Sequence, residues 1–93
     1  MNFFEIKDKT GRKIILPNKQ GSHIRQRHPN VDFHIIEEAL TTPIRIIQVE
    51  EGVAVYYLHL KHRKEPARFL KVLVKYLNGE GYVITSYFVK DML

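Results

Sequence analysis

The chain contains no cysteine among its 93 residues. A disulfide framework and a thiolate metal site are therefore excluded, and the composition fits a reducing compartment. No stretch approaches the ~18 uninterrupted apolar residues of a membrane helix. The first ten residues, MNFFEIKDKT, carry four charges where a signal peptide has an uncharged segment. We therefore expect a cytoplasmic, soluble protein that does not enter a membrane.

Several catalytic motifs are also missing from the sequence. There is no Gly-rich phosphate loop, no G-x-S-x-G elbow and no H-E-x-x-H helix. His59 and His62 lie three residues apart, but no cysteine or paired carboxylate completes a ligand shell around them. The sequence therefore predicts neither a metal site nor a cofactor.

Basic residues exceed acidic ones, 15 to 10, which gives a formal charge of +5 when the five histidines are counted as neutral. A basic surface on so short a chain favours an anionic partner, nucleic acid first, although the charge could also serve solubility alone. The hydrophobic fraction of 44% is ordinary for a folded protein. The length leaves room for one core, so residues 1–93 are predicted to form a single domain.

The residue patterns predict an α+β fold in three parts. Residues 2–17 read as an N-terminal β-hairpin that Pro17 ends. Two short helices follow: the first is capped by Asn18 or Ser22 and stopped by Pro29, and the second is capped by Asn30 or Asp32. β-rich runs at 44–50, 53–60, 69–77 and 82–89 then predict a four-stranded antiparallel β-meander, with the helices on one face.

The segment GSHIRQRHP, residues 21–29, places two histidines and two arginines on the first predicted helix. His23 and Arg27 are four residues apart and share one face, whereas His28 shares a face with Ile24. One imidazole is expected to face a substrate and the other to brace the helix, with His23 preferred for the first role. The alternative is that both occupy a polar helix surface.

The last strand and its neighbour hold a second group of polar residues. Thr85 and Tyr87 point to one face of a strand and Ser86 to the other. A two-residue Asn-Gly turn sets Lys71 opposite Ser86, whereas an added bulge, for which Gly81 is the candidate, sets Lys71 opposite Tyr87. Lys75 shares the face of Lys71, and both could instead be solvated lysines.

The connection HLKHRKEPAR, residues 59–68, concentrates basic side chains, among them Arg63, Lys64 and Arg68. It reads either as a patch that follows phosphates or as a charged surface loop.

Metal-free RNA cleavage needs an acid, a base and a cation near the phosphate. Histidine suits the first two roles, because its unperturbed pKa is about 6.5.

His23-Ile24, Arg27-His28-Pro29 and Thr85-Ser86-Tyr87 together resemble the signature pieces of the barnase, EndoU, colicin and RelE-like (BECR) nuclease superfamily, in its phage- and mobile-element-associated branch. Serine stands here in the small middle position of a Thr-Ala-Tyr-like tripeptide. The resemblance implies a toxin-like, metal-independent ribonuclease that cleaves RNA, often tRNA, through its 2′-hydroxyl. A lethal activity of this kind implies an acidic antitoxin or immunity protein.

The alternatives are an inactive RNA- or protein-binding module of the same fold and a structural element of a mobile-element protein. The expected catalytic residues are His23, His28, Lys71, Thr85 and Tyr87, and the expected substrate-binding residues are Arg27, Arg63, Lys64, Arg68 and Lys75.

Overall fold

Two helices and six strands make up the part of the chain that the computed structural model describes, residues 2–93. The predicted α+β class and its two helices are confirmed. The elements in chain order are β1 (Asn2–Lys7), β2 (Lys13–Pro17), α1 (Asn18–Arg27), α2 (Phe33–Thr41), β3 (Arg45–Glu50), β4 (Val53–His59), β5 (Phe69–Leu77) and β6 (Glu80–Val89).

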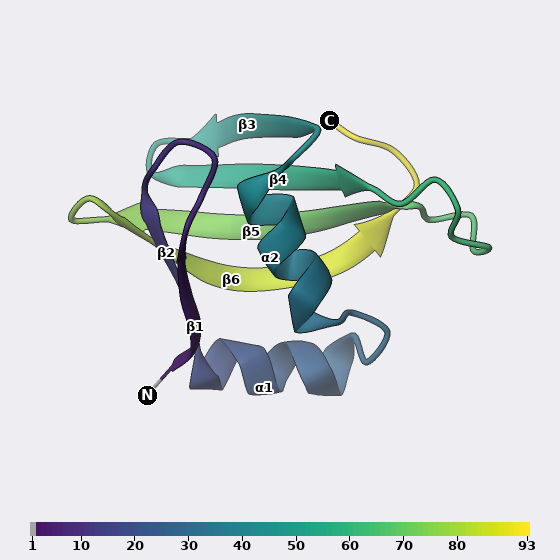
Figure 1. The fold of residues 1–93 in the computed structure, drawn as a ribbon, viewed down its shortest axis with the longest axis horizontal. Coiled ribbons are helices and arrows are strands. Elements are labelled where there is room, and N and C mark those ends of the chain that lie inside the picture. Colours follow the sequence, from purple (N-terminus) through teal and green to yellow (C-terminus); the bar gives the residue numbers. More distant parts are fainter. Residues whose placement is uncertain (1) are drawn as a thin grey trace.

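All six strands belong to one mixed sheet, in the order β1-β2-β6-β5-β4-β3 (Figure 1). Strands β3 to β6 are antiparallel neighbours, but β2 runs parallel to β6 and pairs with it at Gly81 and Tyr82. The prediction of a four-stranded antiparallel meander is therefore wrong in detail, because the hairpin extends the sheet and makes it mixed. The run Ile14–Leu16 is buried throughout, which is typical of an interior strand covered on both faces.

The helices cover different parts of this sheet (Figure 1). Helix α2 crosses one face and contacts β4 and β5, whereas α1 runs along β6. Ile24 of α1 and Leu40 of α2 are buried in the same core as Tyr56 and Val72 of the sheet. Only Gly81 and Tyr82 of β6 pair with β2, so the rest of that edge of β6 is left to α1.

Capping differs between the helices. Asp32 caps α2, as predicted, and its carboxylate accepts a 2.8 Å hydrogen bond from the backbone N–H of His34. The predicted caps of α1 are wrong, because Pro17 occupies the N-cap position and no side chain of the described residues caps the helix there. At the other end His28 is the C-cap and Pro29 follows, which agrees with the predicted stop.

The β5–β6 hairpin contains both a tight turn and a bulge. Asn78 and Gly79 have φ angles of 54° and 82°, and they pair Leu77 with Glu80. Farther from the turn the register shifts, so that Val83 lies opposite Val74 but Thr85 lies opposite Leu73. The bulge alternative is therefore confirmed. Its expected position at Gly81 is wrong, because Gly81 pairs regularly with Tyr76 and Ile84 is the extra residue.

One buried carboxylate ties the β1–β2 loop to the sheet. Oδ1 of Asp8 accepts hydrogen bonds from the backbone N–H of Thr10 and of Arg12, both at 2.9 Å, and from the Thr10 hydroxyl at 2.7 Å. Oδ2 accepts from the Tyr56 hydroxyl, whose oxygen lies 2.6 Å from that of Tyr76. Because Tyr56 gives its only proton to Asp8, Tyr76 donates to Tyr56.

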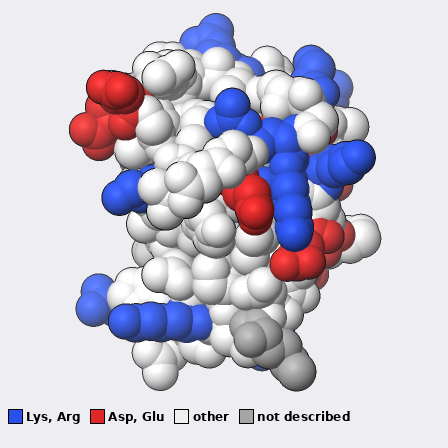
Figure 2. All heavy atoms as spheres, turned by 90° about the vertical axis from the view of Figure 1, so that its left-hand side faces the viewer, with Lys and Arg blue, Asp and Glu red and all other residues white. Residues whose placement is uncertain are grey.

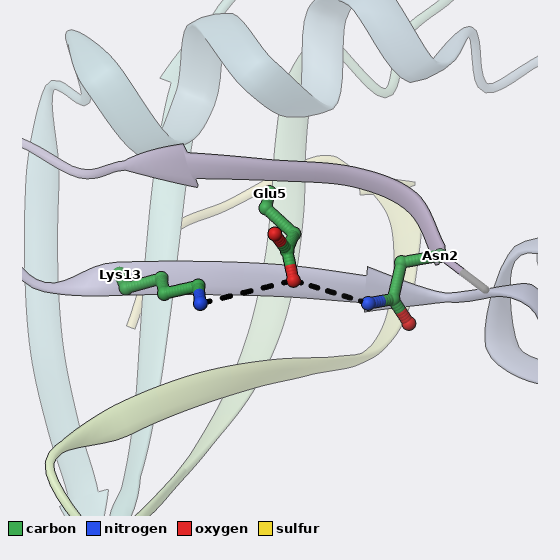
Figure 3. Close-up of polar contacts among 3 residues, drawn as sticks. All are labelled: Asn2, Glu5 and Lys13. Carbon is green, nitrogen blue, oxygen red and sulfur yellow. Dashed lines mark hydrogen bonds and ion pairs between the residues drawn. The ribbon is translucent and has the colours of Figure 1, made fainter.

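The polar contacts on the outside of the hairpin are weaker (Figure 3). Glu5 lies 3.8 Å from the Lys13 ammonium and accepts a 3.3 Å hydrogen bond from the Asn2 amide. These side chains are exposed, and exposed ion pairs contribute little to stability. Asp8 is therefore the main polar anchor of this loop.

Candidate functional site

An open cleft of about 500 Å³ lies at the C-terminal end of β6. Its walls come from the connection between α1 and α2, from the loop at residues 60–68, and from β6 itself. The basic and hydrogen-bonding side chains that line it include His28, Asn30, Arg63, Tyr87 and Lys90. Glu65 is the acidic residue of its lining, so the cleft is predominantly basic.

His28 and Tyr87 are in contact in this cleft. Their ring centroids are 5.4 Å apart and the ring planes are inclined by 30°. The end of the helix positions the backbone of His28 at this point, because its N–H donates to the carbonyl of Ile24 at 2.7 Å and Ile24 is buried in the core. An imidazole thus meets a phenol at the edge of the sheet, and both side chains are only half-buried.

Lys71 joins this pair from the neighbouring strand. It lies directly opposite Tyr87, and its Nζ is 5.6 Å from the centre of the Tyr87 ring. Thr85 lies one step farther along, opposite Leu73, and therefore points to the same side. We call this side of β5 and β6, opposite α2, the outer face. Ser86 points the other way into the core, where it is 0% exposed.

Arg63 is held in place on the wall of the cleft. Its guanidinium carbon lies 3.7 Å from the centre of the Phe88 ring, and Nη1 donates to the carbonyl of Ala67 at 2.6 Å. A guanidinium fixed by a ring and a carbonyl is pre-organised to bind an oxyanion with its remaining N–H groups. The predicted residues Lys64 and Arg68 are exposed in the same loop but do not line the cleft.

His23 lies at a different place from His28. It lines a second hollow with Lys19 and Gln26 of α1 and Ile84 of β6. Ile24 turns one face of α1 into the core, and His28, four residues later, shares that face, whereas His23 is rotated away from it. The structure thus brings His28, and not the preferred His23, to Tyr87.

Two further predicted residues also lie away from the cleft. Arg27 is exposed at the end of α1 and is not part of the cleft lining. Lys75 is on the outer face, opposite Tyr82, nearer the other end of the hairpin. The five expected substrate-binding residues therefore do not form one surface, and only Arg63 is at the cleft.

Sequence reasoning missed six of the nine residues that line the cleft, among them Asn30, Phe88 and Lys90. Asn30 follows His28 by two positions and Lys90 follows the end of β6, so their places in the chain were a usable signal. Phe88 carries no such signal, because it alternates along β6 like any core residue. Its role as the platform of Arg63 depends on how the 60–68 loop folds back.

Basic side chains are not confined to the cleft. Figure 2 shows Lys and Arg spread over the end of the molecule that carries the hairpin turns, with acidic side chains among them. Net charge alone therefore does not locate a site, whereas the contacts of Tyr87 with His28 and Lys71 and the presence of Arg63 in the cleft lining do.

No protein-family model, curated protein or solved structure matches the chain. Among residues 2–93, no three His, Cys, Asp or Glu side chains are grouped as metal ligands would be. Within the same residues, neither helix is both long and apolar enough to cross a membrane.

Proposed function

We propose that the protein is a cytoplasmic, metal-independent ribonuclease with a site centred on His28 and Tyr87. The observation that carries the proposal is the contact between these two rings in an open cleft that also holds Arg63 and Lys90. The resemblance of the sequence to the BECR nucleases supports the same reaction class. We assign all the side chains of this site to one domain, residues 1–93.

The reaction begins with attack of the RNA 2′-oxygen on the adjacent phosphorus. His28 accepts the 2′-hydroxyl proton, the new P–O2′ bond forms, and the P–O5′ bond breaks to leave a 2′,3′-cyclic phosphate. The departing 5′-oxygen takes a proton from water, which the open cleft admits. Arg63, which lines the cleft with His28 and Tyr87, stabilises the additional negative charge on the phosphorane, and the Tyr87 hydroxyl donates to one of its oxygens. Lys71 and Thr85 lie beside Tyr87 on the outer face and bind the neighbouring phosphate.

A tRNA cleavage assay with EDTA present tests this proposal. We expect the wild type to cut total tRNA and to leave 2′,3′-cyclic phosphate ends. The His28→Ala variant should be slower by about 10² to 10⁴-fold, the usual contribution of a general acid or base. His34→Ala is the matched control, because His34 is exposed on α2 and lines no part of the cleft. His23→Ala should also retain activity.

Two results would overturn the proposal. One is intact tRNA after incubation with the wild type, and the other is equal cleavage by His28→Ala and His34→Ala. If the wild type binds tRNA in a salt-sensitive way without cutting it, the chain is instead an inactive binding module of the same fold.

A toxin-like ribonuclease also needs an inhibitor in the cell that makes it. The basic lining of the cleft, with Arg63 and Lys90, is the surface that an acidic antitoxin or immunity protein would cover. Expression of the wild type should therefore be toxic, and expression of His28→Ala should not.

A further inference from the structure

A second tyrosine lies on the outer face at the turn end of the hairpin. Tyr82 is half-buried and lies directly opposite Lys75. It lines a hollow of about 310 Å³ together with Pro17, Gln20 and Lys75. A tyrosine and a lysine are thus register partners on the outer face here, as Tyr87 and Lys71 are nearer the cleft.

The bulge aligns these two pairs on one face. In a regular strand, residues three apart, such as Tyr82 and Thr85, point to opposite faces. Because Ile84 is an extra residue, Tyr82 faces the side of Lys75 while Thr85 and Tyr87 face the side of Leu73 and Lys71. Lys71 and Lys75 are four residues apart on β5, which corresponds to about 13 Å along the strand.

We infer that a single-stranded RNA with its scissile phosphate at His28 continues along the outer face to a second subsite, where a base stacks on Tyr82 and a phosphate meets Lys75. This inference rests on the proposed function. Stacking on tyrosine requires an unstacked base, which a single strand or loop provides and a duplex does not. Alternation of aromatic platforms with lysines is the usual way to bind such a strand. Glu80, opposite Leu77 beside the turn, marks the end of this track.

Binding to RNA of two lengths tests the second subsite. We would use 2′-O-methyl oligonucleotides, which cannot be cleaved through the 2′-hydroxyl, and follow their fluorescence anisotropy with the whole chain. Tyr82→Leu keeps apolar bulk but removes the ring, so it should weaken binding of a hexanucleotide about tenfold. The same variant should bind a dinucleotide as the wild type does, because a dinucleotide fills only the cleft.

Three companion variants separate stacking from charge. Tyr82→Phe keeps the ring and should bind the hexanucleotide like the wild type. Lys75→Ala should weaken hexanucleotide binding and reduce its salt slope by about one. Lys7→Ala removes one charge from the exposed part of β1. It is the control that should change neither the affinity for the hexanucleotide nor the salt slope.

The inference is overturned if Tyr82→Leu binds the hexanucleotide normally, or if it weakens the dinucleotide and the hexanucleotide equally. Failure of the proposed function gives a different result, since the wild type would then cut no tRNA. In that case, length-dependent binding through Tyr82 would still establish the subsite as an RNA-binding surface.

Discussion

Replacing the carboxylate of Asp8 by an amide should destabilise the fold strongly. Asp8 is 6% exposed and accepts hydrogen bonds from two backbone N–H groups and two hydroxyls. Asp8→Asn keeps the size of the side chain and removes its charge. The two backbone N–H groups stay bonded to an oxygen, and the Tyr56 hydroxyl loses its charged acceptor.

The size of the effect follows from the strength of each hydrogen bond. A bond to a charged group contributes about 1.5 to 3 kcal/mol and a neutral one about 1 kcal/mol. If each of the four bonds loses about 0.5 to 1 kcal/mol, the total loss is about 2 to 4 kcal/mol. A domain of this length shifts its melting temperature by about 4 to 8 °C per kcal/mol, which predicts a fall of roughly 8 to 32 °C. The loss of about 2 to 4 kcal/mol is a large share of the ~5 to 15 kcal/mol that stabilises a typical domain.

The pH dependence of stability gives a second measure of how much the Asp8 carboxylate stabilises the fold. Burial of Asp8 raises its pKa, but hydrogen bonds from Tyr56, Thr10 and the Arg12 amide outweigh it, so its pKa lies below the ordinary 3.8. Burial, and then the bond to Asp8, raises the pKa of Tyr56, which therefore stays protonated as a donor. The unfolded chain thus binds the Asp8 proton first as the pH falls, and the stability that Asp8 confers is complete near neutrality. It declines below about pH 5 and is lost as the pH passes the lowered pKa.

Urea unfolding of the wild type and of Asp8→Asn, at neutral pH and at a series of acidic pH values, measures both effects. The difference between the two proteins should shrink toward low pH. Asp32→Asn is the control, since Asp32 is exposed and asparagine caps a helix about as well as aspartate. The reasoning is refuted if Asp8→Asn unfolds at the same urea concentration as the wild type, or if the difference does not change with pH.

Other variants test the packing of β6 and the cleft. Ser86→Ala should stabilise the fold by about 1 kcal/mol in urea, because its buried hydroxyl has no hydrogen-bond partner among residues 2–93; a loss of stability would contradict this. Gly81→Ala should cost about 1 to 3 kcal/mol, because overpacking a core is unfavourable. Its new Cβ would lie 2.5 Å from Cδ1 of Ile14, so Ile14→Val, which deletes that atom, should reduce the cost in a double mutant. Arg63→Lys keeps the charge but loses the fixed guanidinium plane, and tRNA cleavage should fall about tenfold with an unchanged urea midpoint; equal cleavage would exclude that role.

Local chemistry explains which parts of the fold were predictable. The Asn78-Gly79 turn requires positive φ angles that these residues tolerate, Pro29 cannot continue a helix, and the Asp32 carboxylate satisfies a helix N-terminus. The parallel pairing of β2 with β6 joins residues far apart in the chain, and no local preference specifies it. Its one trace in the sequence is the apolar run Ile14–Leu16, which does not alternate as a half-exposed hairpin strand does.

In the candidate site, too, local sequence determined some features and long-range packing determined the others. The spacing of Ile24 and His28 already placed His28 on the apolar face of its helix, and that face determines which imidazole approaches the sheet. Spacing could not show that α1 lies beside β6, and without that contact His23 and its neighbour Arg27 looked more suitable for a phosphate. Arg63 was identified by composition alone, whereas its fixed position depends on Phe88 and on the path of the loop.

A single extra residue determines the chemistry available at the cleft. If Ile84 did not bulge, the register of the tight turn would continue and Ser86 would lie opposite Lys71. Tyr87 would then point into the core and Ser86 outward, leaving His28 without its aromatic neighbour. Instead the bulge buries the small serine, at the cost of an unpaired hydroxyl, and exposes the large tyrosine next to an imidazole and an ammonium. The Ser86 hydroxyl, which has no partner among residues 2–93, and the outward-facing, half-buried Tyr87 ring are therefore two consequences of one register shift. Stabilisation by Ser86→Ala would confirm the first consequence. Loss of cleavage by an Ile84 deletion that keeps the urea midpoint of the wild type would confirm that the shift serves the site.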